Sequence, residues 1–410
     1  MQQMFIVTLY IGLSVVVVYS LFNLWLIKCW YNCAKKQHKA SNQSHVTSTN
    51  PRPTIDIIVA VRNEALLNLT ITSLAQQQYP TDKYQIILVD DFTNDVKSLS
   101  VLAQIQESNW PVRLKIIRLC DELPKAYEQV PNKKRALEIG AKASTAQYLL
   151  FTDGDCIAHP RWLETLTDYM ADNNLYKMVL AGIKPLPGSG FIHQFASSEQ
   201  AALTILAGGS LLAGIPLMAN GANLCISREV FEEINGYSPW LDKPSGDDII
   251  LLRKVHQKYP KEIGFCFHSK AIIETRFPKD LSSFWNQRRR WVSKSLSMPS
   301  KQITAVILLM FFTQVCMIAL LGVMGFAIYQ SNIKLLWLSC SGIFLKTFID
   351  SILIALGFRY IGYKMKLRDY LLMPLHQLVN IVYNMALGLY SLASNGKGYL
   401  WKGRKVTKTP

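Results

Sequence analysis

The sequence predicts an α/β domain with a doubly wound, largely parallel sheet, and transmembrane helices on both sides of it. Residues 54–275 alternate short apolar runs with helix-forming segments, and this alternation favours such a sheet. One long apolar run precedes this region and three follow it. Half of the 410 residues are apolar and only 18% are charged, which excludes disordered, collagen-like and small disulfide-rich proteins.

The first apolar run, residues 5–27, contains no charged residue. As a helix it would extend about 34 Å, which is enough to cross a bilayer. It is too long for a signal peptide, and basic residues follow it, which places residue 28 onward in the cytosol. We therefore predict a transmembrane anchor over residues 1–28 and a linker over residues 29–53, which is polar toward its end and contains two prolines.

The predicted catalytic domain covers residues 54–285. Its strands are expected at 54–61, 84–90, 113–119 and 147–153, with helices at 65–77, 95–107 and 132–144. The apolar runs are short, branched and nearly continuous, as buried parallel strands require. Ligands of such sheets bind at the carboxyl ends of the strands. Three of these strands end in polar clusters, which we take as the first sign of a site: Arg62-Asn63-Glu64, Asp90-Asp91 and Asp153-Gly154-Asp155.

The C-terminal part divides into an interfacial amphipathic segment (286–302), a transmembrane region (303–394) and a basic tail (395–410). In the transmembrane region, Lys346 and Asp350 are spaced to pair on one helix. The last apolar run, 370–393, carries a polar stripe that we expect to hold helices together rather than to line a substrate passage: His376, Asn380 and Asn384. Four crossings would place the basic tail outside, against the positive-inside rule, so 370–393 is the candidate for a re-entrant or interfacial segment.

The net charge of +16 is concentrated beside the apolar runs. Eighteen of the 44 basic residues lie in four segments that contain no acidic residue: 28–40, 286–301, 359–368 and 395–410. The rest of the chain is nearly neutral, so we expect no nucleic-acid partner and instead contacts with anionic lipid headgroups. The eight cysteines form no CxxC pair, which excludes a zinc site or a thioredoxin-like centre of that type and fits a reduced, cytosolic domain.

Asp153 and Asp155 form a DxD sequence at the end of a predicted strand. Carboxylates two residues apart can hold Mg²⁺ or Mn²⁺, with a substrate's phosphates completing the shell. A solvated turn is the alternative for any single DxD sequence. Asp247 and Asp248 follow a glycine and precede a predicted helix, where a carboxylate either caps the helix or acts as a general base on an acceptor hydroxyl.

Two basic segments complete the candidate site. In residues 287–291 (QRRRW), Arg290 would neutralise a diphosphate, and Trp291 would stack on a sugar ring or acceptor. The alternative is an amphipathic helix on the membrane surface. In residues 132–137 (NKKRAL), cations at the start of a helix would bind a phosphate, or would form a solvated basic face.

In this order, the motifs resemble family 2 glycosyltransferases, the superfamily that includes membrane-bound cellulose, hyaluronan and ceramide-glucoside synthases. The resemblance covers residues 52–292 and rests on VRNE (61–64), ILVDD (87–91), KKRAL (133–137), TDGDC (152–156), NGANLCISREVF (220–231), GDD (246–248) and QRRRW (287–291). It implies a GT-A fold, that is, a Rossmann-like nucleotide-sugar-binding domain. Asp247, Asn132 and Phe92 depart from residues that are common in the family, which bears on the nucleotide preference more than on the chemistry.

The resemblance also implies roles for individual residues. Glu64, Asp90 and Asp91 would hold the uridine and ribose of the donor, and Lys133 would lie near its diphosphate. Asp153 and Asp155 would bind Mg²⁺ or Mn²⁺ together with the diphosphate. Asp248 would be the catalytic base and Asp247 its acidic neighbour, while Gln287, Arg290 and Trp291 match the QxxRW motif. Residues 220–226 would form the floor under the acceptor.

We therefore expect inverting transfer of a sugar from a nucleotide-diphosphate sugar, a UDP-hexose or UDP-N-acetylhexosamine, to a membrane lipid or lipid-linked glycan. The protein would be a multi-pass protein of a bacterial inner (plasma) membrane, with its catalytic domain in the cytoplasm and a role in making cell-envelope glycans or glycolipids. A processive polysaccharide synthase with the same site and a non-catalytic nucleotide-sugar binder are the alternatives. A dinucleotide-dependent oxidoreductase is disfavoured because GxGxxG is absent after the first strand.

Overall fold

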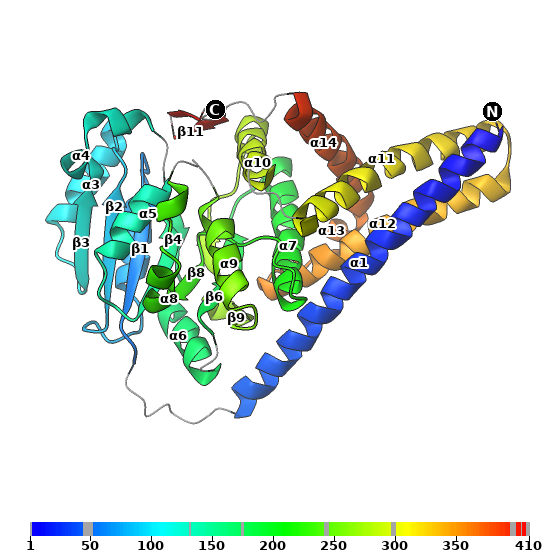
Figure 1. Ribbon diagram of the computed structural model, residues 1–410. Coiled ribbons are helices and arrows are strands. Elements are labelled where there is room, and N and C mark those ends of the chain that lie inside the picture. The colour runs from blue at the N-terminus through cyan, green and yellow to red at the C-terminus, as the bar shows by residue number, and fades with distance from the viewer. Residues whose placement is uncertain are drawn as a thin grey trace.

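The computed structural model describes residues 2–43, 52–130, 133–173, 176–241, 246–296, 301–393, 399–402 and 404–406. An α/β domain forms one side of the molecule, and three long helices extend away from it on the other (Figure 1). These helices are α1 (Gln2–Gln43), α11 (Lys301–Tyr329) and α12 (Ile333–Tyr360). The last described segment, the hairpin β11–β12 (Tyr399–Trp401 and Arg404–Val406), lies back on the α/β side.

The main sheet has seven strands in the order β3-β2-β1-β4-β8-β6-β9. Their bounds are β1 Ile55–Val61, β2 Tyr84–Asp90, β3 Arg113–Arg118, β4 Tyr148–Asp153, β6 Met178–Ala181, β8 Leu224–Ser227 and β9 Ile263–Cys266. The first four strands in this order are parallel, as predicted. β8 is antiparallel to both β4 and β6, so the sheet is mixed. β8 runs opposite to β6 because the chain re-enters the sheet at the end of the strands where β6 finishes. There, just before β8, Ala181 N donates a hydrogen bond to Asn223 O.

Helices cover both faces of this sheet and enclose two apolar cores. The predicted helices are confirmed as α2 (Leu67–Ala75), α3 (Val96–Glu107) and α5 (Lys133–Lys142). The other helices of the domain are α4 (Leu119–Glu122), α6 (Trp162–Asn173), α8 (Arg228–Glu233) and α9 (Asp247–Lys258). A small second sheet joins β5 (Cys156–Ile157), β10 (Ile273–Thr275) and β7 (Ile183–Pro185) in that order.

By length and composition, three described helices could cross a membrane, namely α1 over Gln2–Gln37, α11 and α12. The later helices are the short α13 (Leu367–Leu371) and α14 (Met373–Ala393), and neither qualifies as a span.

α1 extends to Gln43, well past the predicted end of the anchor at residue 28. The predicted start of the linker at residue 29 is therefore wrong, and residues 44–51 lie outside the described part of the chain. Packing on the α/β domain explains the extension. The Trp30 ring contacts the rings of Phe265 and Tyr360, and Gln37 Nε2 donates to Phe265 O at 2.7 Å.

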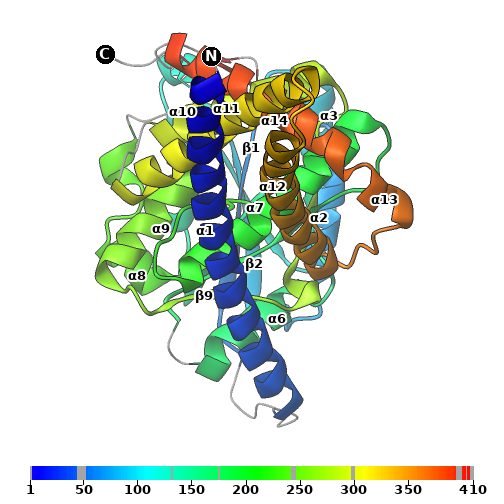
Figure 2. The same cartoon turned by 90° about the vertical axis from the view of Figure 1, so that its right-hand side faces the viewer.

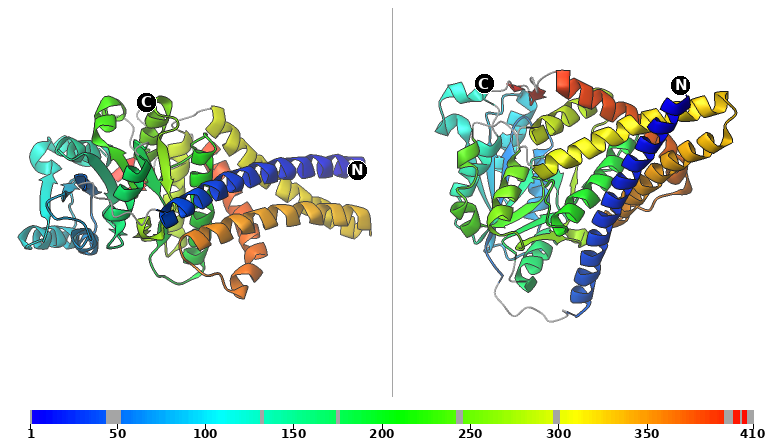
Figure 3. Two further views of the ribbon diagram at one scale, coloured as in Figure 1. Left: turned by 90° about the horizontal axis from the view of Figure 1, so that it is seen from below. Right: turned by 45° about the vertical axis from the view of Figure 1, so that its right-hand side comes forward.

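Helix α7 (Phe191–Leu212) connects the two sides of the molecule. It packs between α1 and α12 (Figures 2 and 3). Small residues allow this approach, because a Cβ at Gly209 would lie 2.8 Å from Leu26 O, and one at Gly357 would collide with the backbone of Ala201. The long apolar helices therefore contact α7 directly.

The predicted Lys346–Asp350 pair is confirmed, with Nζ 2.7 Å from Oδ2. Asp350 also accepts hydrogen bonds from Tyr19 Oη at 2.5 Å and Gln377 Nε2 at 2.7 Å. This buried network joins α1, α12 and α14. In the polar stripe of α14, Asn384 Nδ2 donates to Asn380 O at 2.8 Å.

Candidate active site

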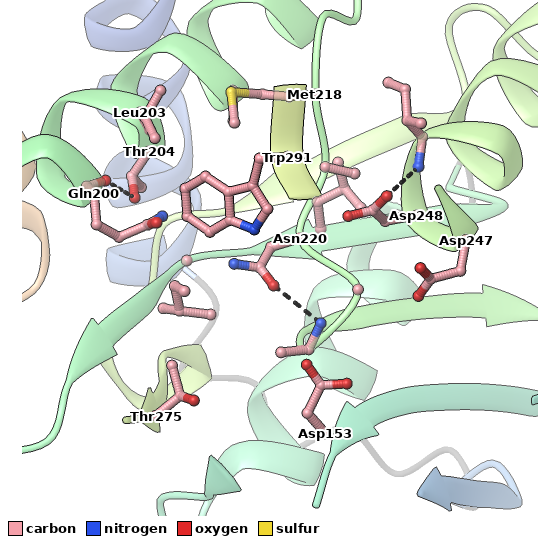
Figure 4. Close-up of a pocket in the computed structure, with 18 of the residues that line it drawn as sticks. Asp153, Gln200, Leu203, Thr204, Met218, Asn220, Asp247, Asp248, Thr275 and Trp291 are labelled. Carbon is pink, nitrogen blue, oxygen red and sulfur yellow. Dashed lines mark hydrogen bonds between the residues drawn. The ribbon is translucent and has the colours of Figure 1, made fainter. Parts of the chain in front are cut away.

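A pocket of about 260 Å³ opens at the carboxyl end of β4 (Figure 4). Eight of the eleven predicted site residues line it: Lys133, Asp153, Asp155, Asp247, Asp248, Gln287, Arg290 and Trp291. The other three, Glu64, Asp90 and Asp91, are absent from this lining. They lie at the ends of β1 and β2, where the C-terminal hairpin contacts two of them.

Asp90 and Asp91 are adjacent in sequence but differ in their partners. Asp90 is fully buried, and its Oδ1 accepts a hydrogen bond from Thr93 N at 3.0 Å. Its Oδ2 has no hydrogen-bond partner among the described residues, although Arg118 Nε lies 3.7 Å away. Asp91 instead makes a two-pronged ion pair with Arg404 of the hairpin, at 2.7 and 3.2 Å. Burial raises the pKa of Asp91, and Arg404 opposes this shift.

Glu64 is also paired with the hairpin. Lys402 Nζ lies 2.9 Å from Glu64 Oε2, while Glu64 Oε1 accepts from Leu66 N at 3.2 Å. The prediction that the cations of the tail face lipid headgroups is therefore wrong for Lys402 and Arg404. Sequence spacing gives no sign of these contacts, because more than 300 residues separate the partners.

Lys133, at the start of α5, joins the DxD carboxylates to α9. Its ammonium group bonds to Asp153 and lies 3.3 Å from Asp247 Oδ2. Burial acts to lower the pKa of Lys133, but Asp153 and Asp247 outweigh it, so the pKa is raised and the lysine stays charged. The pKa of Asp155 is raised to about 6 by burial and by repulsion from Asp153 and Glu64, with Lys402 opposing.

The donor set around Asp153 and Asp155 fits Mg²⁺ or Mn²⁺. Both side chains offer carboxylate oxygens, the ligands these ions prefer. Burial is the main cause of the raised pKa of Asp155, and the nearby carboxylates of Asp153 and Glu64 add repulsion that a cation would relieve. No group of three or more His, Cys, Asp or Glu side chains in the described residues could hold a metal. The remaining ligands would then come from the donor's phosphates and water.

Asp247 and Asp248 occupy the first turn of α9. The turn before them requires Gly246, whose φ is 92°, a value that other residues rarely adopt. Asp248 is 6% exposed, and its Oδ1 accepts from Ile249 N at 2.6 Å. The residue therefore binds a backbone N–H in the first turn of α9 and also lines the pocket, while the N-cap position itself is Gly246.

The loop before β8 forms one side of the pocket through Met218, Asn220, Gly221 and Ala222. Asn220 Oδ1 accepts from Ala222 N at 3.0 Å. Asn223 fixes the end of the loop, since its Nδ2 donates to Gly182 O at 2.8 Å and to Ala271 O at 2.7 Å. A Cβ at Gly221 would lie 2.8 Å from Asp247 Oδ2, so the loop closely approaches the acidic pair.

The QRRRW sequence lies within α10 (Leu281–Leu296), a helix that begins before the predicted interfacial segment. Gln287, Arg290 and Trp291 line the pocket, and Trp291 projects into it (Figure 4). The sequence analysis missed Arg288, which is 2% exposed and bonds to Glu199 of α7. Its guanidinium also stacks on the Trp291 ring at 4.2 Å. Nothing in the spacing of the three arginines indicates which one is buried.

The part of the pocket away from the carboxylates is mainly apolar, with the polar Gln200 and Thr204 of α7 beside Leu203 (Figure 4). Its apolar side chains come from α7, from the following loop and from the next helix: Leu203, Ala207, Leu217, Met218 and Ile303. Ile303 belongs to α11, one of the helices long enough to cross a membrane. One continuous pocket therefore runs from the DxD carboxylates to the start of a membrane-type helix.

Residues 56–234 match the model of glycosyl transferase family 2. A segment of 118 residues is 28% identical to glycosyltransferase AglE of Haloferax volcanii and covers 28% of this chain and 35% of that protein. Another is 30% identical over 118 residues to the poly(ribitol-phosphate) beta-N-acetylglucosaminyltransferase TarP of Staphylococcus aureus, covering 29% and 33%. The matched part thus spans about a third of the length of these curated relatives.

The structure is similar to that of the mannosyltransferase PcManGT from Pyrobaculum calidifontis, which was solved in complex with GDP-Man and Mn²⁺. The TM-score is 0.51 at 15% identity, over 93% of this chain and 99% of that one. The fold is therefore the GT-A type of glycosyltransferases, with a mixed α/β sheet and apolar helices in the N- and C-terminal regions. The chain is thus similar to family 2 glycosyltransferases over residues 56–234, and its fold agrees with that similarity.

Proposed function

We propose that this protein transfers a single sugar from a nucleotide-diphosphate sugar to a lipid or lipid-linked acceptor at the membrane surface, with inversion at the anomeric carbon. The observation that carries the proposal is the two-ended pocket. One end gathers Lys133, Asp153 and Asp155, which suit a diphosphate, and the other is mainly apolar and reaches Ile303 of α11. An acceptor with a hydroxyl head and a hydrocarbon tail matches both ends.

In this mechanism Lys133 binds the donor's phosphates, and Arg290 adds positive charge near the leaving group. A divalent cation held by Asp153 and Asp155 would supply further charge neutralisation of the departing diphosphate. Asp248 accepts the proton of the acceptor hydroxyl while that oxygen attacks the anomeric carbon from the side opposite the leaving group. A carboxylate suffices because proton loss can lag behind attack. Trp291 packs against the sugar or acceptor.

We further propose that α1, α11 and α12 span the membrane and that the catalytic domain lies in the cytoplasm, with α14 at the interface. The three helices have the required length and composition. The basic segments beside them favour this orientation under the positive-inside rule. α14 exposes Leu375, Leu378, Val382 and Leu389, as an interfacial helix would.

The experiment that tests this function uses membranes containing the full chain, labelled UDP- and GDP-sugars, and Mn²⁺ or Mg²⁺. Label is then separated into solvent-extractable lipid and high-molecular-weight polymer, with Asp248→Asn as the control. Label in the lipid fraction that disappears in the control is the expected result. Label in polymer would identify a processive synthase, and nucleotide binding without transfer to either fraction would favour a non-catalytic binder.

A further inference from the structure

The C-terminal hairpin reaches the donor side of the site. Lys402, in the turn between β11 and β12, bonds to Glu64, and Arg404, at the start of β12, bonds to Asp91. The backbone is held as well, because Arg62 Nε donates to Lys402 O at 3.3 Å. β11 also packs against α10, the helix of the QRRRW sequence (Figure 1). The hairpin therefore bridges the ends of β1 and β2 and the helix α10.

The contact made by Arg404 has the geometry of a permanent anchor. The side chains of Arg404 and Asp91 are only 1% and 6% exposed. A third bond runs from Arg404 Nη2 to Asp91 O at 3.2 Å, and the guanidinium carbon lies 5.9 Å from the centre of the Phe92 ring. Removing one partner of such a buried pair leaves the other charge uncompensated, which destabilises the fold. The hairpin is thus bound as part of the domain.

Asp90 and Asp91 then have different tasks. Arg404 bonds to both carboxylate oxygens of Asp91. The buried Asp90 Oδ2 keeps an acceptor position without a hydrogen-bond partner among the described residues. Asp91 is therefore the carboxylate that holds the hairpin, whereas Asp90 is enclosed by the fold.

Lys402 differs from Arg404 in its exposure. Its side chain is 37% exposed, and its Nζ donates to Glu64 Oε2 at 2.9 Å and to Asn63 O at 3.2 Å. Glu64 also lies 3.9 Å from Arg276, a residue of the pocket lining, so Lys402 stands beside the pocket. An ammonium group on a flexible stem at this point can turn from Glu64 to a phosphate.

Building on the proposed function, we propose that the C-terminal hairpin is a wall of the donor site, in which Arg404 anchors the hairpin on Asp91 and Lys402 binds the donor's phosphates. Arg404 is a positioning residue, and Lys402 makes the contact with the donor. Lys402 and the Lys133 ammonium would then approach the diphosphate from two parts of the fold that are far apart in sequence.

The test measures equilibrium binding of UDP, GDP and the nucleosides uridine and guanosine to the purified full chain with Mn²⁺. Lys402→Met removes the charge and keeps the aliphatic stem. Lys97→Met, at an exposed lysine of α3, is the matched control. A charged hydrogen bond of about 1.5–3 kcal/mol corresponds to roughly 10- to 150-fold in affinity. We expect a loss in this range for the diphosphates bound by the wild-type chain, with nucleoside binding and the control unchanged.

Arg404→Lys tests the anchor, because it keeps the charge but loses the two-pronged geometry. We expect weaker diphosphate binding in this variant and a smaller additional effect of Lys402→Met than in the wild-type chain. Three results for Lys402→Met would overturn the proposal: unchanged diphosphate affinity, an equal loss of nucleoside affinity, or tighter diphosphate binding. Tighter binding would mean that the hairpin competes with the donor. A wild-type chain that binds none of these probes would overturn the proposed function itself.

Discussion

The two halves of the pocket are built in different ways. In the donor half, Asp153 is the last residue of β4 and Lys133 is the first residue of α5, so the ends of two elements of the α/β domain carry the charges. In the acceptor half, α7, α10 and the start of α11 meet through contacts between distant segments, such as Arg288 with Glu199. The difference suggests that changes in the donor half alter nucleotide binding, whereas changes in the acceptor half alter transfer and helix packing.

Asp248 lies where the two halves meet, and its removal is expected to give the largest effect. Asp248→Asn should lower turnover by ~10²–10⁴, the usual loss for a missing general base. Nucleotide binding should be unchanged because the diphosphate ligands remain. Turnover is measured as sugar transfer, and binding by titration with UDP and GDP. If binding fell as much as turnover, Asp248 would have a structural role in the donor half.

The Arg288–Glu199 pair tests the acceptor half by itself. Glu199→Gln leaves the buried Arg288 guanidinium without its counter-charge, and the fold should lose about 3 kcal/mol or more. Thermal unfolding of the full chain measures this loss. The exposed pair formed by Arg228 and Glu232 is the control, and Glu232→Gln should cost below about 1 kcal/mol. Similar unfolding temperatures for both variants would contradict a stabilising role of the buried Arg288–Glu199 ion pair between α7 and α10.

The contact of α12 with α7 can be altered at one glycine. Gly357→Leu introduces a side chain against the Ala201 backbone, and overpacking of this kind costs about 1–3 kcal/mol. We expect reduced transfer with nucleotide affinity retained, because α7 lines only the acceptor half. Gly322→Leu is the control, since nothing lies within 4 Å of its added Cβ. Loss of nucleotide binding in Gly357→Leu would show that the halves are coupled.

The smallest effect concerns pH and the donor half. The pKa of Asp155 is raised to about 6, so the carboxyl group is ionised at pH 7.5 and mostly protonated at pH 5. Because a divalent cation binds the ionised form, Mn²⁺ affinity should fall about tenfold between these two values. The pKa of Asp155 is higher in the folded chain than in the unfolded chain. Protonation of Asp155 therefore stabilises the metal-free fold as the pH falls through 6. Mn²⁺ titrations in the presence of UDP measure the effect, and an equal pH dependence in Asp155→Asn would refute the assignment.

The sequence predicted the donor half well because its signals are local. Four strands ended within one residue of their predicted ends, since buried parallel strands produce short apolar runs bounded by polar residues. The reversed direction of β8 was not predicted, because direction depends on where the chain re-enters the sheet. The burial of Arg288, the extension of α1 and the contacts of Lys402 and Arg404 were also missed. Each depends on a partner at least 89 residues away, and no periodicity or spacing reports such contacts.

The measurement that tests the two-ended pocket most directly compares nucleotide binding and lipid transfer in Leu203→Trp. Leu203 lines the apolar end, and tryptophan would fill the space assigned to the acceptor's hydrocarbon chain. Leu206→Trp, on the same helix but outside the pocket lining, is the control. The account predicts that Leu203→Trp binds UDP or GDP as the wild type does but loses transfer to lipid, while Leu206→Trp retains both. Undiminished lipid transfer in Leu203→Trp would contradict an acceptor site at this end of the pocket.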